Sequence, residues 1–447
     1  MGKLSFRKGL LPIDGLDFAA GRTLVQERVL EIYSPREVLV PMLQHIGTPA
    51  VPCVAEGADV SIGQLIGRPS SRISLPVHAT ISGTVTAIET VTLSNGVRTE
   101  AVHIRSDNKR RYHASVARRA NPERLSPKEL SLLLLRSGIA GMGGEGYPAY
   151  AKCVRAVGNG VTRLYVNGLS SEPHLSCDLH LIHEQADRVI SGALALGSCC
   201  QVREIFFCIQ DSFQPEIAIL RSALDRIRPM YPDRHLEMLV FRSRFPQGYE
   251  RLLIRATTGV ELEDSQLPEN TVASVVYNVS TCAAFWDMVE RNLPSVSRII
   301  TISDDKASVK NVLVPFGTLL SDLLERTPGV QTAHRIVVGG ALTGASVNRL
   351  DIPITKQTQG IALIKEEHPV RTPCIHCGAC VEACPVGLLP YVCNRLIELS
   401  DFRALAAESI DRCISCGACS YVCPAGIELS ARIVRAAHSM PRKEPET

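Results

Sequence analysis

The chain has 447 residues, of which 45% are hydrophobic and 21% charged, so it can bury several cores, and its length suggests about three domains. Its net charge of +3 is close to neutral and gives no reason to expect nucleic acid or an anionic membrane surface as a partner. No apolar run approaches the ~18 residues of a membrane span, and residues 1–8 lack the apolar core of a signal peptide. We therefore expect a cytoplasmic protein without direct membrane insertion, which can still dock on a membrane through partner subunits.

The middle of the chain alternates helix and strand patterns. A helix is predicted from Pro127 to Leu135, because Ser126 and Glu129 form a capping box with proline at the first helical position. Beyond it the pattern predicts strands at 163–166, 204–209 and 237–241, and helices at about 182–196 and 215–227. Strands that alternate with helices of this length predict a parallel α/β sheet.

A glycine-rich loop follows the first of these helices. Its glycines are Gly141, Gly143, Gly144 and Gly146. Glycines let backbone N–H groups face an anion without a Cβ in the way, and such loops near a helix start commonly hold phosphate. Lys152 follows at a distance from which its side chain could reach the same phosphate. A tight structural turn is the alternative interpretation of this loop.

The cysteine spacing carries the most specific signal. Of the 16 cysteines, nine lie between Cys374 and Cys423, and dense cysteines in a long cytosolic chain usually bind metal rather than form disulfides. Two runs read Cys-x2-Cys-x2-Cys-x3-Cys-Pro. The first run is Cys374, Cys377, Cys380 and Cys384, and the second is Cys413, Cys416, Cys419 and Cys423.

These runs are typical of bacterial ferredoxins that carry two [4Fe–4S] clusters, in which the fourth cysteine of each run binds the other cluster. Cluster one is then predicted on Cys374, Cys377, Cys380 and Cys423, and cluster two on Cys384, Cys413, Cys416 and Cys419. A pair of zinc sites is the alternative, but zinc typically uses cysteine pairs or Cys/His mixtures. Cys393 stands outside both runs and is expected in a core. Helices are predicted over Tyr391–Ala406 and after Ser430.

With these motifs in this order, the chain resembles the C subunit of the Rnf electron-transport complex and its paralogues. It is more distantly similar to the flavin- and NADH-binding subunit of respiratory complex I. In the family, the glycine loop and its nearby lysine bind the phosphate of FMN, which implies this role for Gly141, Gly143, Gly144, Gly146 and Lys152. The resemblance further implies cofactor-binding roles for Asn167, Glu172, Glu250, Asn278 and Thr281. For the two glutamates, a solvated surface carboxylate is the alternative.

The chain departs from the family pattern around the expected flavin. Ser170 replaces the first glutamate of the family's Asn-Gly-Ala-Glu-Cys-Glu-Pro motif, and Gln210 and the stretch Ala341–Thr343 also differ. In the relatives, acidic residues near the flavin help to orient the nicotinamide dinucleotide. The departures therefore affect the expected NADH site more than the expected FMN site.

The resemblance implies a multidomain α/β and α+β fold. Its expected domains are an unmodified, lipoyl-like barrel-sandwich domain at 1–115, a Rossmann-like FMN domain at 120–290, a soluble-ligand-binding β-grasp domain at 291–360 and a ferredoxin-type domain with two clusters at 365–435. In the β-grasp domain, strands are expected at Arg298–Ile302 and Val312–Pro315, and a helix at Leu319–Glu325. The barrel tip around His78 lacks a carrier lysine, so no covalent cofactor is expected there, and His45 and His78 are expected to be structural.

The implied activity is that of an oxidoreductase that transfers electrons as part of a larger assembly. NADH would reduce FMN, and the electrons would leave singly through the two clusters to a redox partner, either a ferredoxin or the membrane subunits of an Rnf-type complex. One alternative is an adaptor without an NADH site that serves a partner reductase, such as proline reductase or a cobalamin reductase of bacterial microcompartments. A non-redox scaffold with structural clusters is the other. No acid–base triad is evident, so no catalytic residue is predicted.

Overall fold

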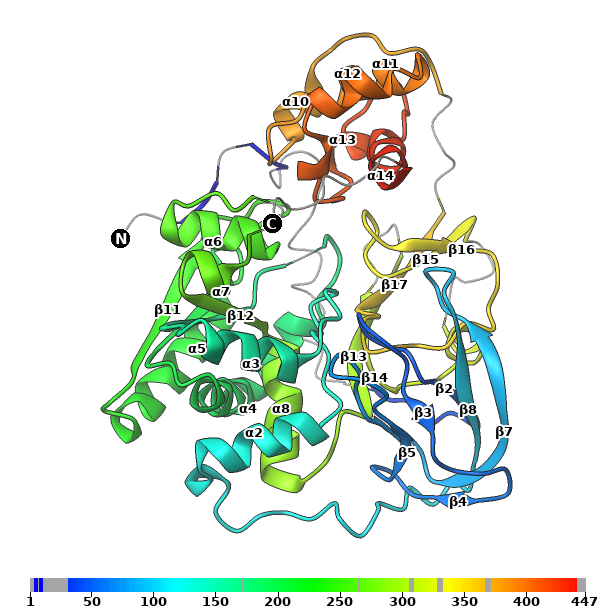
Figure 1. The fold of residues 1–447 in the computed structure, drawn as a ribbon, viewed down its shortest axis with the longest axis vertical. Helices are drawn as coiled ribbons and strands as arrows, with labels where there is room; N and C mark the ends of the chain where they lie inside the picture. The colour runs from blue at the N-terminus through cyan, green and yellow to red at the C-terminus, as the bar shows by residue number, and fades with distance from the viewer. Residues whose placement is uncertain are drawn as a thin grey trace.

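The structure is a computed structural model, and it describes residues 4–6, 8–10, 31–170, 172–263, 266–304, 309–327, 333–365 and 371–439. The chain folds into two small antiparallel sheets, a parallel sheet, a mixed sheet and a C-terminal helical module (Figure 1). No helix in these ranges is long and apolar enough to cross a membrane.

The two antiparallel sheets face each other across one core. Their strands are β2 (Glu37–Pro41), β8 (Arg98–Ser106), β7 (Gly83–Thr92) and β4 (Asp59–Val60) in the first sheet, and β3 (Val51–Pro52), β5 (Leu65–Arg68) and β6 (Val77–His78) in the second. Val38 and Ile104 of the first sheet pack with Ile66 and Val77 of the second. Two sheets that share their inner faces agree with the predicted barrel sandwich.

The parallel sheet has the strand order β11-β10-β9-β12, as the alternating pattern predicted. Its strands are β9 (Arg163–Asn167), β10 (Glu204–Gln210), β11 (His235–Phe241) and β12 (Ser274–Asn278). The helices of this domain are α2 (Pro127–Arg136), α3 (Ala149–Gly158), α4 (Cys177–Cys199), α5 (Gln214–Ile227), α6 (Glu250–Thr258), α7 (Pro268–Thr271) and α8 (Val279–Arg291). The predicted capping box at the start of α2 is present. Short 3-10 helices lie at Pro122–Arg124 and Arg228–Met230.

Helices cover both faces of the parallel sheet. On β9, Leu164 and Val166 belong to the large core that α2, α3, α4, α5 and α8 complete, whereas Tyr165 packs on the opposite face with Leu253 and Ile254 of α6. Successive strand residues point to opposite faces, so a strand buried on both sides is apolar throughout. The polar side chains of β9 and β10 accordingly lie at the ends of these strands, with Asn167 and Gln210 at the carboxyl ends.

The mixed sheet has the order β1-β14-β13-β17-β15-β16. Its elements are β1 (Glu31–Ile32), β13 (Ser297–Asp304), β14 (Val309–Pro315), α9 (Leu320–Glu325), β15 (Arg335–Val338), β16 (Ala345–Val347) and β17 (Gly360–Ile364). Leu320, Leu323 and Leu324 of α9 pack against Ile300 and Val312 of the sheet. A helix held against a mixed sheet in this way agrees with the predicted β-grasp unit.

The C-terminal module is helical. It contains α10 (Ala379–Ala383), α11 (Pro390–Glu398), α12 (Phe402–Ala407), a 3-10 turn (Ile410–Arg412), α13 (Ala418–Tyr421) and α14 (Leu429–Ser439). The prediction of one helix over Tyr391–Ala406 is wrong. The chain breaks between α11 and α12 because Ser400 adopts a left-handed φ of 55°, and the Asp401 side chain caps α12 by accepting a hydrogen bond from the amide of Ala404.

Candidate functional site

Two asparagines meet at the carboxyl edge of the parallel sheet. Asn167 ends β9, Asn278 ends β12, and the two residues are partners in the strand register. Asn278 also caps α8, since its Oδ1 accepts from the amide of Ser280 at 2.8 Å, while its Nδ2 donates to Asp178 at 2.6 Å. The Asn167 Nδ2 donates to the carbonyl of Gly248 at 2.8 Å. Ligands of open α/β sheets bind outside the carboxyl ends of the strands, so both asparagines lie where a ligand is expected.

The glycine loop is a closed turn beside this edge. The amide of Gly146 donates to the carbonyl of Gly141 at 3.0 Å, and the amide of Met142 donates to the Thr281 hydroxyl of α8 at 3.0 Å. In the part of the chain that the structure describes, the amides of Gly143 and Gly144 make no backbone hydrogen bond. Two such amides in a turn form a nest that suits an anion.

The two neighbouring domains hold this loop in place. From the barrel, the amide of Ile46 donates to the carbonyl of Gly146 at 2.8 Å, and from the β-grasp unit the buried Lys356 Nζ donates to the carbonyl of Gly138 at 2.6 Å. Burial lowers the pKa of Lys356 to about 7. Gly146 has a φ of 69°, and a Cβ there would lie 1.6 Å from Nε2 of Gln357. The sequence patterns did not reveal Lys356, because no local signal connects it with the loop.

Lys152 projects from α3 toward the glycine loop. Its Nζ lies 2.8 Å from Glu250 and 3.2 Å from Glu145, and its side chain is only 3% exposed. Burial lowers the pKa of Lys152, but the carboxylates of Glu145, Glu250 and Glu269 outweigh it, so the net shift is upward and the lysine is charged. Burial raises the pKa of Glu250 to about 7 despite this lysine. Glu250 is thus a partly buried carboxylate with its side chain 26% exposed, and Lys152 pairs with both carboxylates.

Two buried glutamines complete the edge and were not predicted as site residues. Gln210 ends β10, and its Oε1 accepts from the amide of Ser170 at 3.1 Å, while its Nε2 has no hydrogen-bond partner among the described residues. Gln247 is fully buried, and neither amide atom of its side chain has such a partner. Buried polar atoms are almost always hydrogen-bonded. Orphaned amides at this edge therefore fit a polar ligand.

The residues present fit FMN. The amides of Gly143 and Gly144 together with Lys152 would hold a phosphate. Asn167, Asn278 and the two orphaned glutamines would meet polar groups of the ring and ribityl chain. This donor set matches the acceptors that FMN offers. Gln210 is the last residue of β10 and Gln247 follows β11 by six residues, so no shared local pattern marked the two glutamines as site residues.

Glu172 lies apart from the glycine loop. It is 2% exposed, and its carboxylate accepts hydrogen bonds from the amide of Leu342, at 3.0 Å, and from the Thr343 hydroxyl. Burial raises its pKa to about 7, and the bonds from Thr343 and Leu342 partly offset that effect. The hydroxyl of Ser170 donates to the carbonyl of Glu172 at 2.7 Å. Glu172 is thus a buried contact between the parallel-sheet domain and the β-grasp unit.

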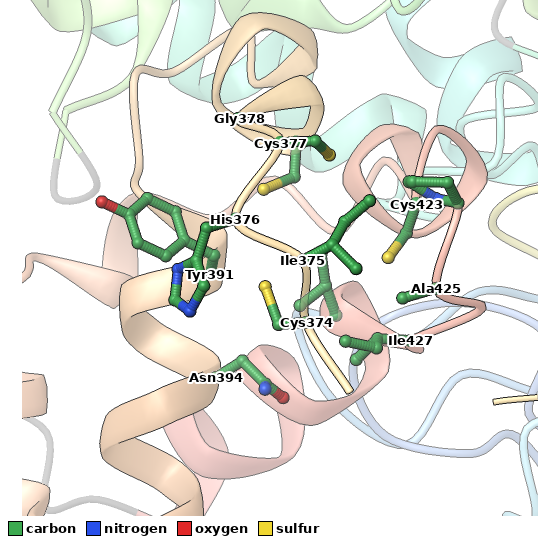
Figure 2. A pocket seen from close by; sticks show the side chains of 13 residues that line it. Cys374, Ile375, His376, Cys377, Gly378, Tyr391, Asn394, Cys423, Ala425 and Ile427 are labelled. Atoms are coloured by element: carbon green, nitrogen blue, oxygen red, sulfur yellow. The ribbon is translucent and has the colours of Figure 1, made fainter. Parts of the chain in front are cut away.

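The cysteines of cluster one line a single pocket (Figure 2). The pocket is lined by three cysteines of the first run and one of the second, namely Cys374, Cys377, Cys380 and Cys423. Among the described residues, no three His, Cys, Asp or Glu side chains gather closely enough for a single metal ion. A cubane spaces its four ligands more widely, and this donor set fits one. The structure therefore brings together the four residues that the crossed arrangement requires.

The cysteines of cluster two are also neighbours. Burial, together with the nearby thiols of Cys384 and Cys413, raises the pKa of Cys416 to about 12. Burial also raises the pKa of Cys419, and the thiols of Cys416, Cys413 and Cys384 add to that effect. Such mutual effects require the four sulfur atoms to be close together. Cys393 is fully buried in a separate core, as predicted.

The two cysteine loops differ in their surroundings. In the loop of cluster one, Cys377 is exposed and Ile375 is 65% exposed. In the loop of cluster two, Cys416 is 8% exposed and packs in one hydrophobic cluster with Phe245 and the partly buried Tyr249. The loop of Cys416, which would hold cluster two, therefore packs against the domain of the glycine loop, whereas the loop of Ile375 and Cys377, which would hold cluster one, is open to solvent.

Comparisons with known proteins agree with this architecture. The RnfC barrel sandwich hybrid domain matches residues 5–109, the Nuo51 FMN-binding domain matches 134–287, and a 4Fe-4S dicluster domain matches 373–427. The chain is 32% identical over 391 residues to the C subunit of the proton-translocating ferredoxin:NAD+ oxidoreductase complex of Clostridium ljungdahlii; the match covers 86% of this chain and 83% of that protein. The chain belongs to the RnfC family. The FMN-binding and two-cluster predictions are thereby confirmed at the level of the domains.

Two further relatives support the placement in the RnfC family. The C subunit of the Na+-translocating ferredoxin:NAD+ oxidoreductase complex of Acetobacterium woodii is 32% identical over 363 residues, which are 80% of each chain. The C subunit of the ion-translocating oxidoreductase complex of Rhodobacter capsulatus is 31% identical over 379 residues, or 83% of this chain and 72% of that one. An NAD+-reducing [NiFe]-hydrogenase in the H2-reduced state shares the fold, with a TM-score of 0.53, 19% identity, and coverage of 71% of this chain and 62% of that chain.

Proposed function

We propose that this RnfC-family chain transfers electrons between a nicotinamide dinucleotide and a redox partner protein, by way of FMN and two [4Fe–4S] clusters. The observation that carries the proposal is the contact of the Cys416 loop with Phe245 and Tyr249, which joins the cluster module to the carboxyl side of the FMN-binding domain. The relatives are named C subunits of ferredoxin:NAD+ oxidoreductase complexes. We infer the same assembly here, with the chain at the cytoplasmic face of the inner membrane, held there by partner subunits.

FMN, when bound, exchanges two electrons with a hydride donor and single electrons with clusters. The protein supplies position and charge. Lys152 would offset the charge of the phosphate and the loop amides would donate to it, while the bonds from Ile46 and Lys356 to the carbonyls of Gly146 and Gly138 fix the loop and the residues before it. The apolar packing around Cys416 excludes water between the two parts. Backbone amides and burial set the cluster potentials.

We propose the eighteen-residue site in two parts, because its members act on different groups. The FMN part comprises Gly141, Gly143, Gly144, Gly146, Lys152, Asn167, Glu250, Asn278 and Thr281, with Glu172 supporting it from the β-grasp contact. The cluster part comprises the eight cysteines in the crossed arrangement. We also propose domain boundaries at 1–115, 120–290, 291–364 and 365–435; the third domain ends at 364 rather than at the predicted 360, because β17 runs to Ile364.

The test is anaerobic. The purified protein, reconstituted with FMN and iron–sulfur clusters, is mixed with NADH, and the loss of flavin absorbance is followed by stopped flow. We expect rapid bleaching, followed by reduction of the clusters. Protein that retains no flavin after reconstitution would overturn the FMN site, and a retained flavin that NADH leaves oxidised would overturn the nicotinamide part.

A second candidate is the electron-transfer adaptor without an NADH site. The residues at two positions that are acidic in the family favour this candidate. One is Ser170, which has no carboxylate, and the other is Glu172, whose carboxylate is already bound by Leu342 and Thr343. Neither is available to orient a nicotinamide dinucleotide. Reduction of the bound flavin by the partner protein, but not by NADH, would select this candidate.

A further inference from the structure

A short amino-terminal segment, residues 4–6 and 8–10, touches both the parallel-sheet domain and the cluster module. On the sheet side, Leu4 joins the edge at β11, since its amide donates to the carbonyl of Val240 at 3.3 Å and its carbonyl accepts from the amide of Arg242 at 2.9 Å. Leu10 pairs with Phe245 through two backbone hydrogen bonds of 2.9 Å. The segment is therefore fixed at both ends to the strand β11 and the loop that follows it.

The same segment reaches the cluster module. Lys8 donates from Nζ to the carbonyl of Val381 at 3.2 Å, within α10. Leu10 is 1% exposed and packs with Ala383, Cys416 and Ala418. In Figure 1 the dark blue segment lies between the top of α6 and the orange module. Leu10 is thus bonded to the sheet domain through its backbone, and its side chain packs against the cluster module.

Phe245 and Tyr249 of the sheet domain share this hydrophobic cluster with Leu10, and two other contacts between the parts are weaker. The ion pair of Arg412 with Glu261 joins them at 2.5 Å, but both side chains are nearly half exposed, and exposed pairs contribute little to stability. Gly417 lies against the carbonyl of Leu342, which is a backbone contact. A fully buried leucine contributes more than an exposed ion pair, so Leu10 is, with Phe245, a main side-chain link on the cluster-two side.

We infer that residues 4–6 and 8–10 act as a strut that holds the loop of cluster two against the FMN-binding domain and so fixes the path between flavin and cluster. The inference rests on the proposed function for its meaning. Electron transfer falls steeply with the distance between cofactors, so a small opening at Leu10 slows it. Cluster two is then the cluster that exchanges electrons with the flavin, and the exposed cluster one is the cluster that meets the partner protein.

The test uses the full-length holoprotein with Leu10→Ala, the conservative Leu10→Met, and Leu399→Ala as the matched control, since Leu399 lies on the same module but is 58% exposed. Removing a buried leucine side chain shifts a local opening equilibrium by roughly 30-fold or more. We expect hydrogen exchange at amides 381–384 and 418–422 to accelerate by about that factor in Leu10→Ala. Leu10→Met should restore most of the protection, and Leu399→Ala should match the wild type.

Electron transfer gives the second readout. Cluster reduction is followed after photoreduction of the flavin, so the result does not depend on NADH. We expect several-fold slower cluster reduction in Leu10→Ala, with unchanged FMN and iron content and an unchanged rate of flavin reduction. Unchanged exchange and unchanged transfer would overturn the strut. If Leu10→Ala loses iron, the same two measurements are made on Lys8→Met, which removes only the hydrogen bond to Val381. Protein without flavin would refute the proposed function, while the exchange data would still test the strut.

Discussion

Lys152 has two proposed roles, which are to pair with Glu145 and Glu250 and to bind the phosphate of FMN, and substitutions can separate them. We consider the substitution Lys152→Met, which keeps the length of the side chain and removes its charge. Lys152 is 3% exposed, whereas Glu250 is 26% and Glu145 45% exposed. Removing one partner of a buried ion pair typically costs about 3–5 kcal/mol. Because water reaches both carboxylates, we expect a smaller loss than this, about 2–3 kcal/mol of unfolding free energy.

The same substitution should weaken FMN binding. A hydrogen bond to a charged group contributes about 1.5–3 kcal/mol, which corresponds to a loss of affinity of roughly 10- to 150-fold. Urea unfolding measures the first effect, and quenching of flavin fluorescence during FMN titration measures the second. Lys365→Met is the matched control, since this lysine pairs with Asp304 at 3.5 Å in the β-grasp unit and should change FMN affinity little.

The double variant Lys152→Met/Glu250→Gln separates the two roles. Neutralising Glu250 removes the unpaired carboxylate, so part of the lost stability should return, whereas the FMN affinity should stay low. The interaction energy follows from the double-mutant cycle. If Lys152→Met lowers stability but leaves FMN affinity at the wild-type value, the lysine serves only the ion pair, and its assignment to the phosphate is refuted.

Three further predictions concern the loop, the clusters and the domain contact. Gly146→Ala should weaken FMN binding and lower the unfolding free energy more than Gly160→Ala does. Both positions have a positive φ, but only a Cβ at Gly146 meets another side chain. FMN titrations and unfolding curves of the two variants check this, and equal effects would contradict it. Cys374→Ser and Cys423→Ser should each lose cluster one, Cys384→Ser and Cys413→Ser should each lose cluster two, and Cys393→Ser should keep both. Electron paramagnetic resonance of the reduced proteins shows which cluster is lost. Loss of the same cluster in Cys374→Ser and Cys384→Ser would exclude the crossed arrangement. The pKa of Glu172 is raised from 4.5 to about 7 in the folded protein, so its contribution to stability is present below pH 4.5 and lost as the pH rises through 7; Glu172→Gln should flatten this part of the pH–stability curve, and an unchanged slope would refute the shift.

Local patterns in the sequence determined the elements that depend on neighbouring residues. The capping box at Ser126 fixed the start of α2, and the alternation of apolar strands and helices predicted the parallel sheet. The two cysteine runs predicted both clusters, since ligand spacing is itself a local property. The break at Ser400 was missed because a left-handed residue within an apolar helical pattern leaves no periodic signal.

Only the tertiary structure decided which distant residues meet. It paired Lys152 with Glu250, left the buried amides of Gln210 and Gln247 without a partner among the described residues, and placed Glu172 against Leu342 of the β-grasp unit. The link from Leu10 to Cys416 spans almost the whole chain. Burial, ion pairing and domain contact depend on residues far apart in sequence, and a pattern read along one segment carries no information about its partner. The cysteine ligands of the two clusters could therefore be predicted from the sequence, whereas only the fold showed which cysteine loop packs against the flavin domain.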